Sequence, residues 1–233
     1  MNAPPVAPRS ARVAAGVLLI STPILFTICF TLLQLHFSYP DILREPAPHI
    51  LERFHAARHQ LLPMWYGMML SALLFVALAI ACSRVFTRNT TTSLVLGVIA
   101  GLVQAIGLAR WVFAVPALAS SLADPSASPP RREAILTTFD TMHALLGVGL
   151  GEHMGYLFTT AWTLTIAHAL RQSNRWLATS GALCGLGILV GVAEPLGQSW
   201  AGTVNALAYS AWSLWLICLG IMVLRDRTDH HPA

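Results

Sequence analysis

Long runs of apolar residues dominate this sequence of 233 residues. Six stretches of about 20 residues carry almost no charge, and this is the length that a helix needs to cross ~30 Å of hydrocarbon. The stretches cover roughly residues 13–35, 61–82, 93–116, 143–169, 177–196 and 204–224. We therefore predict an all-α fold, an integral membrane bundle of six transmembrane helices that forms a single domain over residues 1–233.

The composition supports this interpretation. The sequence is 55% hydrophobic and 10% charged, whereas soluble domains carry about 25% charged residues. The sequence contains no nucleotide-binding loop and no clustered basic patch, so we expect the lipid bilayer as a partner and no nucleic acid. All four cysteines fall within the crossings, which argues against a disulfide framework.

The distribution of the basic residues predicts the orientation of the bundle. All of them are arginines, and eight lie beside the membrane on the side that carries both termini: Arg9, Arg12, Arg84, Arg88, Arg171, Arg175, Arg225 and Arg227. The other side carries Arg44, Arg53, Arg58, Arg131 and Arg132, diluted by acidic residues. By the positive-inside rule, both termini are expected in the cytoplasm.

The first outward loop is expected to contain a short amphipathic surface helix. The segment His49 to Gln60 places Ile50, Phe54 and Ala57 at helical spacing. Further along, Pro116 lacks a backbone N–H, which predicts a bend or a helix end within two turns of Arg110.

Glycines recur along the fourth and fifth crossings. They are Gly147, Gly149, Gly151 and Gly155 in the fourth and Gly181, Gly185, Gly187 and Gly191 in the fifth. Small residues let helices approach closely in lipid, so we expect these two crossings to pack tightly in the bundle.

Three charged residues lie inside the apolar stretches, where each is costly to insert. Arg110 and Glu152 fall at comparable depths in the third and fourth crossings, so they are expected to be able to meet. Glu194 lies near the outer end of the fifth crossing, and the following Pro195 disfavours helix at that position. One cation and two acids are therefore predicted in one leaflet.

These charges admit three interpretations. Arg110 and Glu152 could form a closed structural ion pair, the charges could line a polar pocket or conduction path, or the acids could act in catalysis. Tyr156 shares a helix face with Glu152, which extends the pocket interpretation to a ligand-binding set of Arg110, Glu152, Tyr156 and Glu194.

The sequence also contains candidate ligands for a metal ion or a haem. His55 and His59 follow Glu52 on one face of the surface helix, a spacing that fits zinc and equally fits a solvated face. Asp140, His143 and His153 could add ligands from the fourth crossing, but no compact metal motif is present. Haem would need two histidines facing each other from different helices, and the deepest two, His143 and His153, share one helix. The sequence indicates no specific cofactor.

One family resemblance follows from these residues. Arg110-Trp111 with Pro116, then Gly149-x-Gly151-Glu152-x-x-Gly155 with Trp162 downstream, resembles the bacterial membrane proteins grouped as domain of unknown function 4386. The likeness covers roughly residues 12–224. It implies a protein of the bacterial inner (plasma) membrane with six crossings, and it implies no substrate.

The leading hypothesis is a multi-pass inner-membrane protein that binds or passes a small molecule, lipid headgroup or proton through an outer-leaflet polar cavity. In it, Arg110 holds an anionic group. One alternative is a metal-dependent intramembrane hydrolase or oxidoreductase that uses the outer histidines. Another is a structural or assembly protein, in which Arg110 and Glu152 form a closed ion pair with no cavity beside them.

Overall fold

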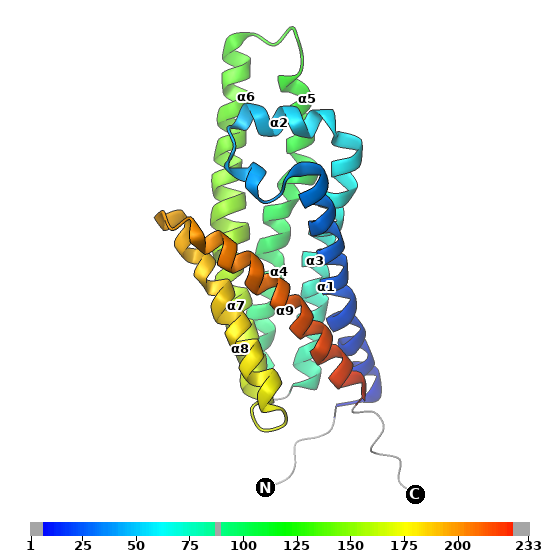
Figure 1. Ribbon diagram of the computed structural model, residues 1–233. Helices are drawn as coiled ribbons and strands as arrows, with labels where there is room; N and C mark the ends of the chain where they lie inside the picture. Colours follow the sequence, from blue (N-terminus) through cyan, green and yellow to red (C-terminus); the bar gives the residue numbers. More distant parts are fainter. Residues whose placement is uncertain (1–6, 87–89, 226–233) are drawn as a thin grey trace, which may run out of the picture.

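The computed structural model describes residues 7–86 and 90–225, and within these ranges it is helical with no strand (Figure 1). Six helical segments are long and apolar enough to cross a membrane: Arg9–Phe37, Arg58–Val85, Thr90–Leu122, Pro129–Leu170, Arg175–Leu196 and Trp200–Arg225. The predicted all-α bundle is confirmed, and the chain is a multi-pass membrane protein. Arg88 and Arg227, used above to predict orientation, lie outside the described residues.

The described elements follow one another as α1 (Arg9–Phe37), the 3-10 helix η1 (Asp41–Arg44), α2 (Ala47–Ala56), α3 (Arg58–Val85), α4 (Thr90–Phe113), α5 (Val115–Leu122), α6 (Pro129–Met142), the π-helix η2 (His143–Met154), α7 (Gly155–Leu170), α8 (Arg175–Leu189), the 3-10 helix η3 (Val190–Leu196) and α9 (Trp200–Arg225). We call the end of the bundle that carries α2 the α2 end. The opposite end, which carries Arg9 and Arg225, is the terminal end (Figure 1).

The short amphipathic helix predicted in the first loop is α2. It buries Ala47, Ile50, Leu51 and Phe54 against the bundle and turns its polar residues outward. The predicted end at Gln60 is wrong, because the helix stops at Ala56 and α3 begins at Arg58. The chain must change direction here from lying across the bundle to crossing it, and Ala57 supplies the turn with non-helical φ and ψ of −111° and 17°.

The break predicted near Pro116 is present. Helix α4 ends at Phe113, and α5 begins at Val115 with proline in its first turn, where the missing N–H costs no helical hydrogen bond. The fifth crossing likewise narrows into the 3-10 helix η3 around Pro195.

The glycines of the fourth crossing pack closely against α4. Gly151 lies against Gly107 of α4, and Gly155 lies against Gln104 of the same helix. The expected close packing is therefore made with α4. Helices α7 and α8 do contact each other, with Gly185 in ordinary contact with Thr163, but the sequence spacing alone carries no information on which helix is the neighbour.

An aromatic cluster fills the space beneath α2. The rings of Trp65 and Trp111 stack with centroids 4.5 Å apart and planes within 5°. Phe37, Phe54 and Phe139 pack around them, largely edge-on. This cluster fixes α2 to α1, α3, α4 and α6, and it holds the neighbouring Arg110 at the same level of the bundle.

Candidate functional site

A cavity of about 500 Å³ lies in the half of the bundle toward the α2 end. Its walls come from α1, α3, α4, η2, α7, η3 and α9, and the segment of residues 39–44 covers it from the α2 end. The volume falls in the range of roughly 300–1,000 Å³ typical of small-molecule sites. Arg110, Glu152, Tyr156 and Glu194, the four residues predicted to bind a ligand, all line it.

Arg110 is the most deeply buried charge on the cavity wall, with 6% of its surface exposed. Its Nη1 donates to the Gly107 carbonyl one turn earlier, and its guanidinium lies 5.4 Å from the centroid of the Trp111 ring. Its Nε has no hydrogen-bond partner within the part of the chain that the structure describes. Among residues 7–86 and 90–225, no carboxylate lies within ion-pair distance of Arg110.

The guanidinium fits against the fourth crossing because Gly147 has no side chain. A Cβ added at Gly147 would lie 2.6 Å from Nη2 of Arg110, too close for real atoms. The π-helix η2 supplies this glycine and also carries Glu152. Such wide helical turns are rare and are often found at functional sites.

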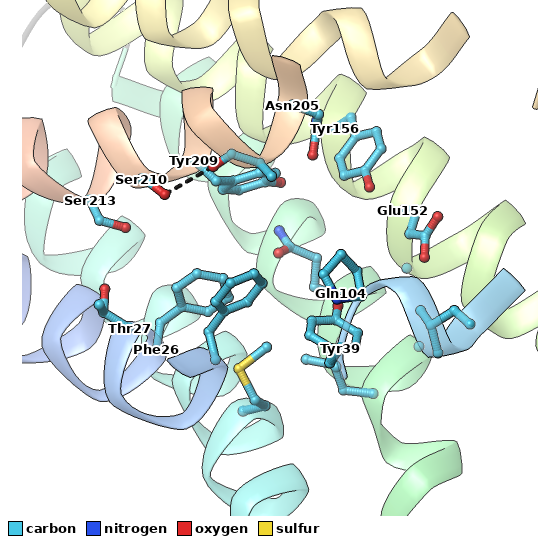
Figure 2. Close-up of a pocket in the computed structure, with 18 of the residues that line it drawn as sticks. Phe26, Thr27, Tyr39, Gln104, Glu152, Tyr156, Asn205, Tyr209, Ser210 and Ser213 are labelled. Carbon is cyan, nitrogen blue, oxygen red and sulfur yellow. Dashed lines mark hydrogen bonds between the residues drawn. The ribbon is translucent and has the colours of Figure 1, made fainter. Parts of the chain in front are cut away.

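Glu152 faces the same cavity, on the wall that also carries Tyr156 (Figure 2). It forms no ion pair within the part of the chain that the structure describes, so the closed Arg110–Glu152 pair considered from the sequence is not formed there. The cavity wall thus offers one cation and one carboxylate that do not neutralise each other directly.

Glu194 is paired with an arginine of the segment that covers the cavity. Its carboxylate forms an ion pair with the guanidinium of Arg44, from η1. Arg44 also donates to the Pro40 carbonyl at 3.3 Å. The pair joins the cover of the cavity to η3, the segment that leads into α9.

Neutral polar groups that the sequence did not single out complete the walls. Gln104 donates to the hydroxyl of Thr159 at 3.0 Å, and Asn205 donates to the Ile188 carbonyl at 2.7 Å. Hydroxyl side chains gather between α1 and α9, and these are Thr27, Ser210 and Ser213 (Figure 2). Small uncharged side chains give no distinctive signal inside an apolar stretch, which is why they were missed.

Tyr39 belongs to the cover of the cavity and lies between α1 and η1, outside the membrane-spanning helices. The pKa of its phenol is raised to about 12, mainly by burial. The carboxylate of Glu152 contributes to this rise, and the charges of Arg110 and Arg44 oppose it. At neutral pH, Tyr39 therefore keeps its proton and can donate a hydrogen bond into the cavity.

The metal candidates are not brought together. Within the described residues, no group of three or more His, Cys, Asp or Glu side chains is placed to hold a metal ion. His55 and His59 are exposed and belong to different helices, because the turn at Ala57 separates α2 from α3. Asp140 is exposed, and His143 stacks on Phe139 at 5.7 Å. His153 is half-buried and is not among the residues that line the cavity.

Comparison with known proteins gives a single finding. The model of a family described as "Domain of unknown function (DUF4386)" matches residues 14–222. No curated protein and no solved structure matches the chain.

Proposed function

The chain belongs to the DUF4386 family, and we propose that it is a membrane protein whose cavity binds a small molecule or lipid headgroup, with Arg110 holding an anionic group of the ligand. Glu152, Tyr156 and Glu194 position the ligand from the other walls. A guanidinium suits this role because it stays charged and presents several N–H donors to phosphate or carboxylate oxygens.

The observation that carries the proposal is the state of Arg110. A charge inside a membrane costs roughly 2.5–3.5 kcal/mol by insertion scales, and such residues usually pair with an opposite charge. Arg110 is buried, borders a cavity of about 500 Å³ and has no carboxylate within ion-pair distance among the described residues. An anionic ligand group would supply the missing partner.

Native mass spectrometry of the full chain, purified in mild detergent, tests the proposal. We expect co-purified mass on the wild-type protein and loss of that mass in Arg110→Gln. The matched control is Arg84→Gln, which removes one exposed arginine at the terminal end, outside the cavity. Equal retained mass in the two variants, or a bare wild-type protein, would contradict the proposal.

The proposal places the protein in the inner (plasma) membrane of a bacterium, as a single transmembrane domain with the terminal end in the cytoplasm. The arginine bias supports this orientation, since Arg9, Arg12, Arg84, Arg171, Arg175 and Arg225 all lie toward that end. The cavity then opens in the outer leaflet.

A further inference from the structure

The cavity is also bordered by side chains that face the surrounding lipid. On α1, Ile24 is 43% exposed and Ile28 is 53% exposed, and on α9, Leu214 is 65% exposed. All three belong to the cavity lining. The same space therefore reaches from the charged groups beneath η1 to the apolar outer surface of the bundle between α1 and α9.

The packing of α1 and α9 explains this side opening. The two helices meet closely near the terminal end, where a Cβ added at Gly16 would lie 3.2 Å from the Gly220 carbonyl. From there α9 runs obliquely across the bundle, and its first residues lie beside the end of α8 (Figure 1). The helices diverge toward the α2 end, and the hydroxyls of Thr27, Ser210 and Ser213 lie where they separate (Figure 2).

The dimensions fit one leaflet. The lining on α9 extends from Gly202 to Ile217, which at 1.5 Å per residue is roughly 22 Å along the helix axis. Half of the ~30 Å hydrocarbon core is about 15 Å. The cavity is therefore long enough to contact a lipid from its headgroup to the bilayer midplane. The charged end lies beside Trp65 and Trp111, which are fully buried in the aromatic cluster beneath α2.

The charges at that end are complementary to a zwitterion. Arg110 and Glu152 both line the cavity without pairing with each other in the described chain. The guanidinium of Arg110 carries its charge at the cavity wall, and its buried Nε has no hydrogen-bond partner within the described residues. Phosphate oxygens suit the guanidinium, whereas an ammonium suits the carboxylate and the neighbouring rings of Tyr39 and Tyr156.

We infer that the ligand is a single zwitterionic phospholipid, which enters sideways between α1 and α9 and places its phosphate at Arg110 and its ammonium at Glu152. This inference rests on the proposed function and names its ligand class. The acyl chains lie along Ile24, Ile28 and Leu214, in contact with the bilayer.

Lipid retention tests the headgroup assignment. The full chain is reconstituted in vesicles of equal parts phosphatidylethanolamine and phosphatidylglycerol, extracted in mild detergent and weighed by native mass spectrometry. We expect one retained phosphatidylethanolamine per chain, enriched about tenfold over phosphatidylglycerol, as one charged hydrogen bond allows. Glu152→Gln should bring the ratio close to one while a phospholipid stays bound. Glu45→Gln, an exposed acid outside the cavity, should leave the ratio unchanged.

The outcomes separate the two proposals. Equal retention of the two lipids by the wild-type protein, or an unchanged ratio in Glu152→Gln, overturns the zwitterion assignment. A retained molecule that is not a phospholipid, lost in Arg110→Gln, overturns this inference and leaves the proposed function standing. A wild-type protein without retained mass overturns both.

The side entrance has its own test. Ser210→Trp places an indole at the edge of the opening, whereas Leu207→Trp changes a 67% exposed residue of α9 that does not line the cavity. Exchange of bound lipid for deuterated phosphatidylethanolamine should slow about tenfold in the first variant and stay at the wild-type rate in the second. Thr27→Trp provides the same obstruction from α1 if Ser210→Trp does not fold. Wild-type exchange rates in a folded, obstructed variant overturn lateral entry.

Discussion

The ion pair between Arg44 and Glu194 connects two parts of the chain that are 150 residues apart. Because the two side chains are 50% and 20% exposed, water screens much of their attraction. We expect a double-mutant cycle with Arg44→Gln and Glu194→Gln to give a coupling free energy of about 0.5–1 kcal/mol, measured by thermal unfolding in detergent.

The reversed pair, Arg44→Glu combined with Glu194→Arg, is the control for this ion pair. It should recover most of the stability that either reversal alone removes, since the geometry would still hold opposite charges together. Additive losses in the cycle, without recovery by the reversed pair, would mean that the contact contributes nothing to stability.

Tyr39 predicts a loss of stability at high pH. The folded protein raises the pKa of this phenol to about 12, above the ordinary value of about 10. As the pH rises, the unfolded chain therefore releases this proton before the folded protein does. The stabilisation of the folded state by Tyr39 is fully present below about pH 10 and is lost as the pH rises through about 12. In Tyr39→Phe this loss should be absent, as measured by unfolding between pH 7 and 11.5.

Tyr66→Phe changes a 50% exposed ring on α3 and is the matched control for Tyr39. The expected signature is a wild-type stability that falls relative to Tyr39→Phe only above about pH 10. A constant difference in stability between the wild-type protein and Tyr39→Phe from pH 7 to 11.5 would show that burial does not hold the proton on Tyr39.

At the scale of single residues, sequence reasoning found the charges but not all of their partners. Arg110, Glu152 and Glu194 were predicted because a charge in an apolar stretch is conspicuous, and Tyr156 was added because it shares a helix face with Glu152. All four do line one cavity. Their role in ligand binding remains a prediction. Arg44 was missed because a loop arginine looks ordinary in sequence, and only the turn after α1 brings it over Glu194.

Close helix packing around Arg110 depends on glycine at position 107. A Cβ added there would lie 2.7 Å from Cα of Gly151 and 2.8 Å from the Leu146 carbonyl oxygen, and both are backbone atoms that cannot rotate away. We expect Gly107→Ala to destabilise the protein by about 1–3 kcal/mol, because α4 and η2 must move apart. Thermal unfolding in detergent measures this change.

Gly149→Ala is the matched control in η2, since its added Cβ meets only the Ala144 carbonyl oxygen at 3.4 Å. This change should leave stability near the wild-type value. Equal losses in Gly149→Ala and Gly107→Ala would indicate that alanine disturbs the helices themselves and that the contact between α4 and η2 is not limiting.

The existence of the longer helices was more predictable than their geometry. Apolar periodicity indicated α2, and Pro116 indicated the break after α4, because both depend on neighbouring residues. The π-helix η2 was not predicted. Glycines at 147, 149 and 151 each weaken an α-helix by about 1 kcal/mol. The π-helical turns also depend on contacts between η2 and α4, and the spacing of residues in the sequence does not reveal these contacts.

At the scale of the whole molecule, the six-helix bundle followed from length and hydropathy alone, since a helix that crosses a membrane needs about 20 apolar residues. The oblique course of α9 did not. It depends on close contact of α9 with α1 at Gly16 and Gly220 and on the contact of its other end with η3. Because α9 is close to α1 at one end and separated from α1 at the other, the cavity has its side entrance between these two helices.

The orientation of the bundle is open to a direct prediction. Ser126 is exposed in the loop between α5 and α6, toward the α2 end, and Ser173 is exposed between α7 and α8, toward the terminal end. With the terminal end in the cytoplasm, a membrane-impermeant maleimide should label Ser126→Cys in intact cells. It should label Ser173→Cys only after the membrane is opened.

The wild-type protein provides the background for this labelling, because its four cysteines all lie within the spanning helices. The reverse pattern would place the terminal end outside and the cavity in the cytoplasmic leaflet. That result would leave the cavity and its charges unchanged, but any lipid bound there would then be drawn from the other leaflet. The orientation therefore determines which leaflet supplies the ligand, independently of whether Arg110 binds one.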